Sequence, residues 1–307
     1  MSTIQHFVYV VTGEGALRRS AEAAVSAFSL RCQRPAIRLR LVCDRVAAAE
    51  LGASATTWLE REFDELVVID TAAGSPRATN RRVKLSLRRQ ITGDFVYVDS
   101  DFLFVRPPDA SLDRVEHVGA VRDFPDGDLS NGQLPSYLRE VCESAGWPYP
   151  PPNYWNSGFV VWRDTPRAHA LANRWSELYE IARELTDDRD QPAFAIADLE
   201  HALVESLPWQ YNAPVNANAK FARGAIAWHY WTSLRDHGPQ ARSVMDAMTD
   251  HMLCDAGSVS AVYRRALTTR YPWIDSRGFM SYVAAGAYRS AVGELPRALR
   301  RFIRAQY

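Results

Sequence analysis

The fold of this chain depends on the stretch Asp94-Phe-Val-Tyr-Val-Asp-Ser-Asp-Phe-Leu-Phe-Val-Arg-Pro107. Phe95–Val98 and Phe102–Val105 are short apolar runs with the composition of strands buried on both faces. Two carboxylates, Asp99 and Asp101, stand between these runs. An unpartnered carboxylate beside a buried strand is costly, and clustered carboxylate oxygens suit hard divalent ions such as Mg²⁺ or Mn²⁺. The stretch therefore predicts a metal site, with a polar turn capped by one aspartate as the alternative.

Short apolar runs alternate with helical segments on both sides of this stretch. Such alternation predicts an α/β fold with a mostly parallel sheet and helices on both faces. Ligands bind beyond the carboxyl ends of the strands in these sheets, and the acidic pair falls there. Strands are expected at residues 7–11, 37–42, 66–69, 95–98 and 118–121, and helices at 17–30, 47–63 and, with Asn80 as cap, 80–91.

The second half of the chain continues the pattern after a long loop expected at residues 130–152. A strand follows from Asn153, and Thr165-Pro166 begins a helix with cap and proline in the preferred places. Its apolar side is expected to hold Leu171, Trp175, Leu178 and Leu185, with Trp175 in the core. Another helix opens near residue 190, residues 207–212 form a loop or edge strand, and residues 225–231 form a last strand. Beyond residue 238 the pattern is helical.

Composition excludes several classes of protein. The 307 residues are 47% hydrophobic with zero formal net charge, so nothing points to nucleic acid. Four scattered cysteines without a Cys-x-x-Cys pair indicate a reducing compartment rather than a zinc site or disulfide framework. No signal peptide or membrane-spanning run is evident, so a cytoplasmic protein is expected.

A cationic face precedes the acidic pair. Arg81, Lys84 and Arg88 are spaced i, i+3 and i+7, beside the buried stripe of the expected helix. This face is either solvated or turned toward an anion held at the acidic pair, with Arg81 and Lys84 best placed for the second role. Lys84 and Lys220 are the only lysines of the chain.

Five short motifs follow one another along the chain: Tyr97-Val-Asp99-Ser-Asp101, Asn156-Ser157-Gly158, Asp190-Gln191, Leu207-Pro208-Trp209 with Asn212, and His229-Tyr230. In this order they resemble the motifs of the GT-A glycosyltransferases. The resemblance is to the retaining family-8-like group, which includes bacterial lipopolysaccharide galactosyltransferases and glycogenin, and it covers about residues 5–235. Taken singly, Asp190 or Gln191 is also a plausible helix cap, and His229 a plausible core residue.

The resemblance implies a GT-A (Rossmann-like) fold and a nucleotide-sugar donor, most often a UDP-sugar. It implies Mn²⁺, or Mg²⁺, bound by Asp99, Asp101 and His229. Asp190 and Gln191 are implied as the catalytic pair bordering the transferred sugar. The implied donor-binding set is Thr12, Arg81, Lys84, Asp99, Ser100, Asn156, Ser157 and Arg235.

Two positions depart from the family pattern. The family's histidine motif usually continues through a glycine to Lys-Pro-Trp, whereas here Trp231 follows His229-Tyr230 and Arg235 is the first cation after it. Arg235 could replace the family's lysine at the diphosphate. Pro192 follows Gln191 where the family often has aspartate, which weakens the catalytic interpretation of Asp190.

Together these features predict a metal-dependent hexosyltransferase that acts with retention on a glycan, lipid-linked or small-molecule hydroxyl. One alternative is a non-catalytic nucleotide- or sugar-binding protein on the same fold. The other is a haloacid-dehalogenase-type phosphatase, in which the first aspartate of Asp-x-Asp is the nucleophile. That family carries the motif on its first strand, whereas here about three strands precede it.

We expect a transferase domain at residues 1–238 and a helical C-terminal extension at residues 239–307 that contacts the acceptor or a membrane. On a helix, the last residues form an apolar face opposite a basic one. This helix either packs on the protein or lies in an anionic membrane surface, which would make the protein peripheral on the inner face of the membrane. The apolar face is Leu295, Leu299, Phe302 and Ile303, and the basic face is Arg297, Arg300, Arg301 and Arg304.

Overall fold

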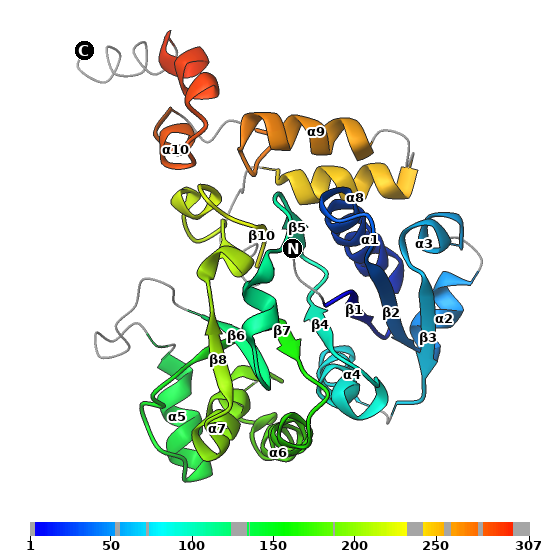
Figure 1. Ribbon diagram of the computed structural model, residues 1–307, viewed down its shortest axis with the longest axis vertical. Coiled ribbons are helices and arrows are strands. Elements are labelled where there is room, and N and C mark those ends of the chain that lie inside the picture. Colours follow the sequence, from blue (N-terminus) through cyan, green and yellow to red (C-terminus); the bar gives the residue numbers. More distant parts are fainter. Residues whose placement is uncertain are drawn as a thin grey trace.

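The computed structural model describes residues 4–52, 56–71, 74–123, 134, 136–186, 188–231, 242–254, 259–275 and 279–296. A seven-stranded sheet in the order β3-β2-β1-β4-β7-β6-β8 forms its centre (Figure 1). Strands β3, β2, β1 and β4 are parallel, β7 is antiparallel to both of its neighbours, and β8 is parallel to β6. The strands are β1 (His6–Val11), β2 (Arg38–Asp44), β3 (Glu65–Ile69), β4 (Phe95–Val98), β6 (Val118–Arg122), β7 (Trp155–Trp162) and β8 (Val204–Leu207).

Helices cover both faces of this sheet, as the α/β prediction requires. Alternate residues of β1 enter two different hydrophobic clusters, because successive side chains of a strand point to opposite faces. One cluster includes residues of α1 and α3, and the other includes residues of α4, α6 and α7. The bounds are α1 (Ala16–Gln33), α2 (Arg45–Leu51), α3 (Thr56–Glu62), α4 (Pro76–Gln90), α5 (Ser136–Ala145), α6 (Pro166–Ala182) and α7 (Gln191–His201), with 3-10 turns η1 (Ala110–Arg114), η3 (Trp209–Asn212) and η4 (Ala219–Ala222).

A smaller sheet lies beyond the carboxyl end of β4. It has the order β5-β10-β9, formed by β5 (Phe102–Phe104), β10 (Ala227–His229) and β9 (Ala213–Pro214). Strand β10 is antiparallel to β5, and its last residue His229 pairs with Phe102. This register brings His229 next to Asp101, although the two residues are distant in sequence.

The C-terminal helices are α8 (Val244–Cys254), α9 (Val259–Thr269) and α10 (Phe279–Ala284). Residues of α8 and α9 share a hydrophobic cluster with α1 and β5, and the hydroxyl of Tyr263 donates to the carbonyl oxygen of Phe104 at 2.6 Å. Helix α8 packs beside α1 and α9 beside α8, whereas α10 contacts η4 and lies apart from that pair (Figure 1). Within the described ranges, no helix has the length and apolarity needed to cross a membrane. All four cysteines are free thiols.

Several expected element boundaries are wrong. The helix expected at residues 47–63 is two helices, α2 and α3, and Asp44 caps the first by accepting from the Ala47 amide. Helix α4 begins at Pro76 rather than Asn80, because the Ser75 side chain accepts from the Ala78 amide. The long loop expected at residues 130–152 contains α5.

Helix α6 begins as expected, with Thr165 as its cap and Pro166 at its first position. Trp175 is in the core, as predicted, and so are Leu171 and Leu178. Leu185, by contrast, lies beyond the end of α6 with 48% of its surface exposed, so its assignment to the apolar side is wrong.

Candidate active site

Three side chains form a group that could hold a metal ion. Asp99 follows β4, Asp101 precedes β5 and His229 ends β10. One ligand atom from each lies within 4.8 Å of the others, and His229 Nε2 is 3.3 Å from Asp101 Oδ1. The alternative in which an aspartate merely caps a turn does not account for this convergence. His229 is buried, but it is also part of a polar cluster.

The donor set fits a divalent ion. Two carboxylates and an imidazole are ligands that Mn²⁺ accepts, and Mg²⁺ favours the carboxylates. The ring of His229 stacks on Phe102 with centroids 4.2 Å apart, and its Nδ1 lies 2.6 Å from Asn212 Oδ1. These contacts direct Nε2 toward the carboxylates, which is the usual arrangement of a metal-binding histidine.

Gly158 on β7 leaves room for the side chain of Asp99. The Asp99 amide donates to the Gly158 carbonyl at 2.8 Å, so the two backbones are in direct contact. A Cβ atom at this glycine would lie 2.7 Å from Asp99 Oδ2 and 3.0 Å from Asn156 Oδ1. Close approach, rather than an unusual backbone conformation, is therefore the reason for glycine here.

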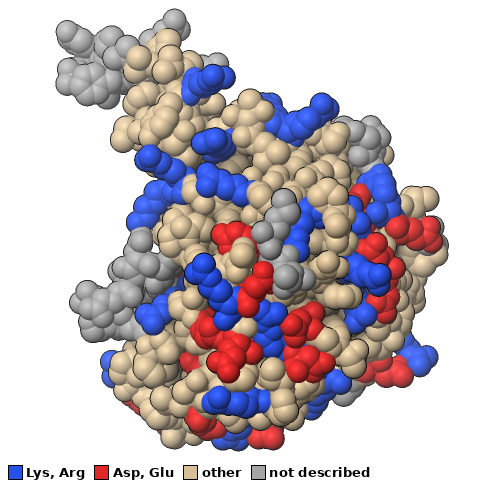
Figure 2. Space-filling model, viewed as in Figure 1, with Lys and Arg blue, Asp and Glu red and all other residues tan. Residues whose placement is uncertain are grey.

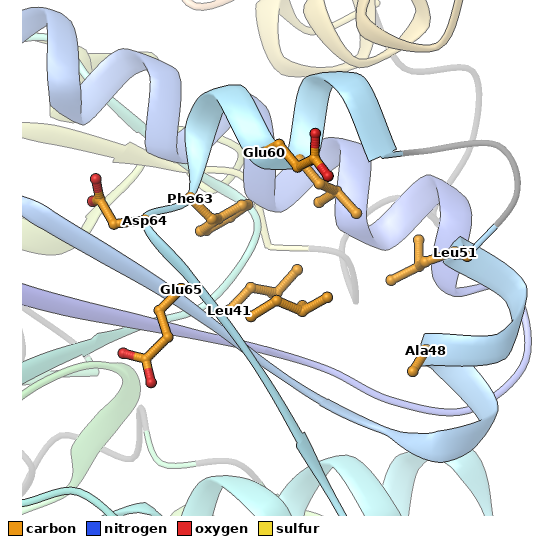
Figure 3. A pocket seen from close by; sticks show the side chains of 10 residues that line it. Leu41, Ala48, Leu51, Glu60, Phe63, Asp64 and Glu65 are labelled. Atoms are coloured by element: carbon orange, nitrogen blue, oxygen red, sulfur yellow. The ribbon is translucent and has the colours of Figure 1, made fainter.

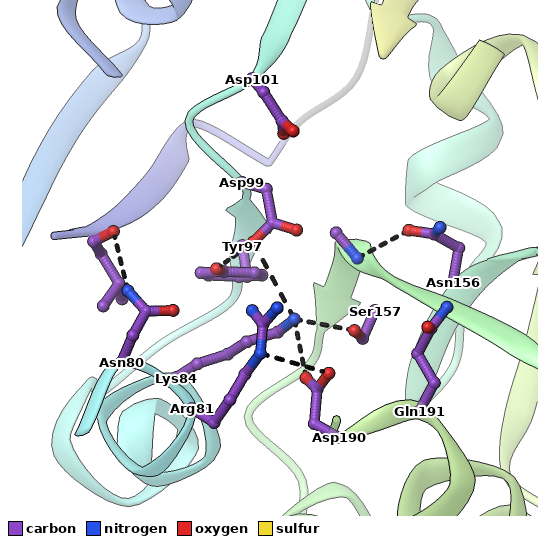
Figure 4. Close-up of polar contacts among 12 residues, drawn as sticks. Asn80, Arg81, Lys84, Tyr97, Asp99, Asp101, Asn156, Ser157, Asp190 and Gln191 are labelled. Atoms are coloured by element: carbon purple, nitrogen blue, oxygen red, sulfur yellow. Dashed lines mark hydrogen bonds and ion pairs between the residues drawn. The ribbon is translucent and has the colours of Figure 1, made fainter. Parts of the chain in front are cut away.

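Two cations of α4 surround one carboxylate beside this group (Figure 4). Lys84 Nζ lies 2.9 Å from Asp190 Oδ2, 2.8 Å from Ser157 Oγ and 3.9 Å from Asp99 Oδ1. Arg81 Nε lies 3.5 Å from Asp190 Oδ1. The Lys84 side chain is 2% exposed and that of Arg81 is 23% exposed, so the solvated alternative is wrong for both.

Arg88, the third member of the expected cationic face, lies elsewhere. Its guanidinium donates to the carbonyl oxygens of Gly93 and Ile91 and lies 3.5 Å from Asp164. It therefore stabilises the end of α4 and the following turn. The structure brings Arg81 and Lys84 to the site and leaves Arg88 out of it.

Asp190 is ionised at neutral pH. It occupies the cap position of α7 but makes no capping hydrogen bond through its side chain, so capping does not explain it. Burial alone would raise its pKa, but attraction to Lys84 and Arg81 outweighs burial and lowers the pKa to about 2. The site thus contains a buried, compensated ion cluster.

Asp123, just after β6, belongs to the site but is absent from the expected set. Asn156 Nδ2 donates to Asp123 Oδ1 at 2.6 Å, and the Gln191 amide, which donates to the Trp155 carbonyl oxygen at 3.4 Å, lies nearby. Burial raises the pKa of Asp123 more than contact with these amides lowers it. The sequence feature that could have identified Asp123 is its position directly after a buried strand, as for Asp99.

A polar pocket of about 330 Å³ opens at the carboxyl ends of β1 and β4. Five of the expected site residues line it: Thr12, Arg81, Asp99, Ser100 and Asp101. Thr12 Oγ1 is buried and, within the described part of the chain, has no hydrogen-bond partner. Arg235, expected at the diphosphate, lies outside the described residues.

Three further side chains that line the pocket come from α1 and α4. Arg19 of α1 lines it and donates to the Thr12 carbonyl oxygen at 2.7 Å. Arg77 and Asn80 of α4 line it as well, so Asn80 is a wall of the pocket rather than the helix cap. The pocket therefore joins a cationic wall to the acidic pair.

A second pocket, of about 320 Å³, lies between α2, α3 and the edge of the sheet (Figure 3). Its lining is mainly aliphatic and aromatic, with Leu41, Leu51 and Phe63 pointing inward. Two carboxylates at its rim are already paired, Asp64 with Arg31 and Glu65 with Arg40. It lacks the convergent polar groups of the first pocket, which is therefore the candidate active site.

Comparison with solved structures identifies the fold. The galactosyltransferase LgtC, in complex with donor and acceptor sugar analogues, matches with a TM-score of 0.52 and 16% identity over 85% of this chain and 95% of that chain. The bifunctional glycosyltransferase WbbM matches with a TM-score of 0.53 and 12% identity, over 86% of this chain and 52% of that chain.

The glycosyltransferase GlyE of Streptococcus pneumoniae TIGR4 matches with a TM-score of 0.52 and 13% identity, over 89% of this chain and 66% of that chain. No family model and no curated protein matches the chain by sequence. The fold is thus shared with proteins of very different sequence. The chain has the GT-A glycosyltransferase fold, of the type seen in LgtC.

Proposed function

We propose that this protein is a metal-dependent glycosyltransferase that moves a hexose from a nucleotide-sugar donor, UDP-linked in our proposal, to a hydroxyl acceptor. One observation carries the proposal: Asp99 and Asp101, which converge with His229, line a pocket whose lining also includes three arginines, Arg19, Arg77 and Arg81. Departure of a nucleoside diphosphate develops negative charge, and both features are placed to stabilise it.

The metal group and the cations have separate roles in this proposal. Asp99, Asp101 and His229 would hold a divalent ion, which would supply positive charge to the leaving diphosphate. Arg81, which lines the pocket, contacts the donor directly. Lys84 is buried behind Asp99 and holds Asp190 and Ser157 in position. Arg235 stays a proposed diphosphate contact on sequence grounds.

We place the transferred sugar beside Asn156, Asp190 and Gln191. LgtC has an active-site glutamine, which supports the choice of Gln191. Asp190 is tied to two cations and is anionic at neutral pH, so it stabilises positive charge on the sugar and is not a proton donor. We propose that transfer retains the anomeric configuration. Inversion would need a general base at the acceptor hydroxyl, and its contacts with two cations make Asp190 a poor base.

The test is Mn²⁺-dependent release of UDP from a panel of UDP-sugars, with and without sugar acceptors. Asp101→Asn should lower turnover at least about 100-fold, because it removes a charged ligand of the metal. Asp70→Asn is the control, since Asp70 is exposed, pairs with Arg45 and does not line the pocket. NMR of the fresh product reports the anomer.

Each alternative predicts a different result in the same assay. A non-catalytic binding protein would bind the nucleotide sugar without any Mn²⁺-dependent turnover. A haloacid-dehalogenase-type phosphatase would release inorganic phosphate from a phosphomonoester, although Asp99 here follows β4 and not the first strand. Unchanged turnover in Asp101→Asn would contradict the metal site.

We also propose that the C-terminal extension contacts an anionic membrane surface and that the acceptor is lipid-linked. Met280 is 71% exposed, Val292 68% and Leu295 42%, so the last described segment presents apolar side chains to solvent. The charged side chains near α9 and α10 in Figure 2 are mainly basic. Exposed arginines of the described C-terminal segment are 264, 265, 270 and 289. The sequence adds arginines 297, 300, 301 and 304, which lie outside the described residues.

Sedimentation with vesicles tests this contact. The full chain should bind vesicles rich in anionic lipid and not neutral ones, and replacing arginines 297, 300, 301 and 304 by glutamine should abolish binding. Equal, negligible binding by both forms would rule the membrane role out.

Free thiols and the absence of a spanning helix in the described ranges are compatible with the cytoplasmic location we propose.

A further inference from the structure

Two side chains reach the same nitrogen atom of His229. Asn212, at the end of η3, places Oδ1 2.6 Å from His229 Nδ1. Trp231 places its indole Nε1 2.5 Å from that same Nδ1, and the two rings meet edge to face. Asn212 is 3% exposed, so water does not compete for this contact.

The chemistry of the two partners prevents both hydrogen bonds from forming at once. The amide oxygen of Asn212 carries no proton, so it can only accept from a protonated Nδ1. The indole N–H of Trp231 can only donate, so it requires a lone pair on Nδ1. A neutral imidazole has one proton for its two nitrogens, and each partner therefore favours a different tautomer.

The choice at Nδ1 decides what the other nitrogen can do. Nε2 lies 3.3 Å from Asp101 Oδ1 and faces the metal group. When Asn212 holds the proton on Nδ1, Nε2 presents a lone pair to a cation. When Trp231 donates to Nδ1, the proton sits on Nε2, points at Asp101 and occupies the position of the cation.

The burial of Asn212 favours a role at His229 over one in packing. Its Nδ2 is buried and has no hydrogen-bond partner in the described ranges. A buried unpaired donor costs about 1–3 kcal/mol. An aliphatic side chain would fill the same space without this cost, so the contact of Oδ1 with the histidine is what the amide provides.

We propose that Asn212 is a positioning residue that fixes His229 in its metal-binding tautomer, and that Trp231 opposes it by holding the other tautomer. The two residues together set the affinity for the divalent ion. This inference rests on the proposed metal-dependent function. It concerns the proton on one ring and requires no further ligand to the metal.

Three variants of the full-length protein test the inference with Mn²⁺ alone. Asn212→Leu removes the acceptor at similar size, Asn212→Asp provides a stronger acceptor, and Trp231→Phe keeps a ring without the donor. Mn²⁺ affinity is measured from the electron paramagnetic resonance signal of the free ion. Asn212→Leu should bind about 10- to 100-fold more weakly, whereas Asn212→Asp and Trp231→Phe should bind at least as tightly as wild type.

A second readout follows the tautomer without any metal. Ring ¹⁵N chemical shifts of His229 should move toward the Nε2-protonated form in Asn212→Leu and toward the Nδ1-protonated form in Trp231→Phe. A purely structural role for Asn212 would not produce these opposite shifts. The tautomer signal also remains interpretable in Trp231→Phe if Asn212→Leu fails to fold.

The outcomes separate this inference from the proposed function. Mn²⁺ binding by wild type with equal affinity in Asn212→Leu overturns the inference and leaves the function intact. Weak binding in both Asn212→Leu and Asn212→Asp overturns it as well, since the acceptor would then not be what matters. Wild type that neither binds Mn²⁺ nor releases UDP overturns the proposed function and the inference together.

Discussion

Asp190 and Asp123 are two buried carboxylates of one site with opposite electrostatic environments. Asp190 contacts two cations, and its pKa is lowered to about 2. Asp123 receives a hydrogen bond from the neutral amide of Asn156, and burial raises its pKa. Lys84, which pairs with Asp190, hydrogen-bonds Ser157, and Asn156 next to it on β7 bonds Asp123.

The difference shows how adjacent residues of β7 can contact the surroundings of two carboxylates, Asp190 with a fixed charge and Asp123 with a charge that depends on pH. Groups whose surroundings push their pKa values apart take different roles in a site. Asp190 has a charge that ordinary pH changes do not alter, which suits electrostatic stabilisation. Asp123 is easier to protonate, which suits hydrogen bonding to a ligand hydroxyl. The predictions below remove, in turn, the Lys84 cation, the close approach of backbone and side chains at Gly158, and the Asp123 charge.

The largest effect is expected from removing the cation between the two halves of the site. Lys84→Met keeps the aliphatic stem but leaves Asp190 with Arg81 alone, and loss of one partner of a buried pair costs about 3–5 kcal/mol. Urea unfolding should show a loss of about 3 kcal/mol. Donor binding should fall as well, because Asp99 and Ser157 lose the same contact.

A double variant serves as the control for this prediction. Lys84→Met combined with Asp190→Asn removes both charges, so most of the lost stability should return although activity does not. Lys84→Arg tests whether charge alone suffices, since the larger guanidinium must fit between Tyr97 and Trp175. If Lys84→Met unfolds like wild type, Asp190 is not a compensated charge.

An intermediate effect is expected from Gly158→Ala, because this glycine lies against Asp99 and Asn156. Asp99 is close to Lys84, the partner of Asp190, and Asn156 bonds Asp123. The added methyl group would meet Asp99 Oδ2 at 2.7 Å and Asn156 Oδ1 at 3.0 Å. Overpacking of this kind costs about 1–3 kcal/mol. Mn²⁺ affinity and stability should therefore fall together, as titration calorimetry and thermal unfolding would show.

Gly52→Ala is the matched control. Gly52 has helical backbone angles, and a Cβ there would make only an ordinary contact of 3.4 Å. It should leave Mn²⁺ affinity unchanged and stability unchanged or slightly raised. Normal Mn²⁺ binding by Gly158→Ala would mean that Asp99 is not confined by this glycine.

The smallest effect is expected from Asp123→Asn, which removes the adjustable charge. Because folding raises the pKa of Asp123, the folded state binds this proton more tightly than the unfolded state does. Its ionisation therefore lowers stability as the pH rises above the ordinary value of 3.8. Asp123→Asn should raise the melting temperature by about 2 °C at pH 7 and by almost nothing at pH 3.

Asp190→Asn gives the opposite pH dependence and sharpens the comparison. The pKa of Asp190 is lowered, so its contribution to stability is present above pH 3.8 and is lost as the pH falls toward about 2. Its replacement should destabilise the protein at pH 7 and much less at pH 2. Parallel pH profiles for the two variants would refute the assignment of opposite environments.

The sequence predicted the elements whose signal is local. Buried strands have short apolar runs, and a proline after a threonine marks the start of α6. Asp99 and Asp101 were predicted as metal ligands because two carboxylates after a buried run need an explanation, and the structure brings them together with His229. His229 was found through the order of motifs, and the register of β10 against β5 explains why that order brings it to the acidic pair.

Features that depend on distant partners were missed. Periodicity could not tell a buried cationic face from a solvated one, because the carboxylate that neutralises Lys84 and Arg81 comes from the start of α7. A single aspartate such as Asp123 is ordinary in a loop until Asn156 is placed against it. Helix α5 was hidden by the glycine, proline and serine residues around it, and Leu138 and Cys142 are buried in its packing.

The ligand atoms of the proposed metal group belong to two different sheets. Asp99 follows a strand of the large sheet, whereas Asp101 precedes β5 and His229 ends β10 in the small one. An ion bound there would therefore join the sheets as a cross-link. The distance between the two sheets, set by packing around Phe102 and Phe159, would decide which ionic radius is accommodated. Selectivity among divalent metals would then be a property of the hydrophobic core as much as of the ligands themselves.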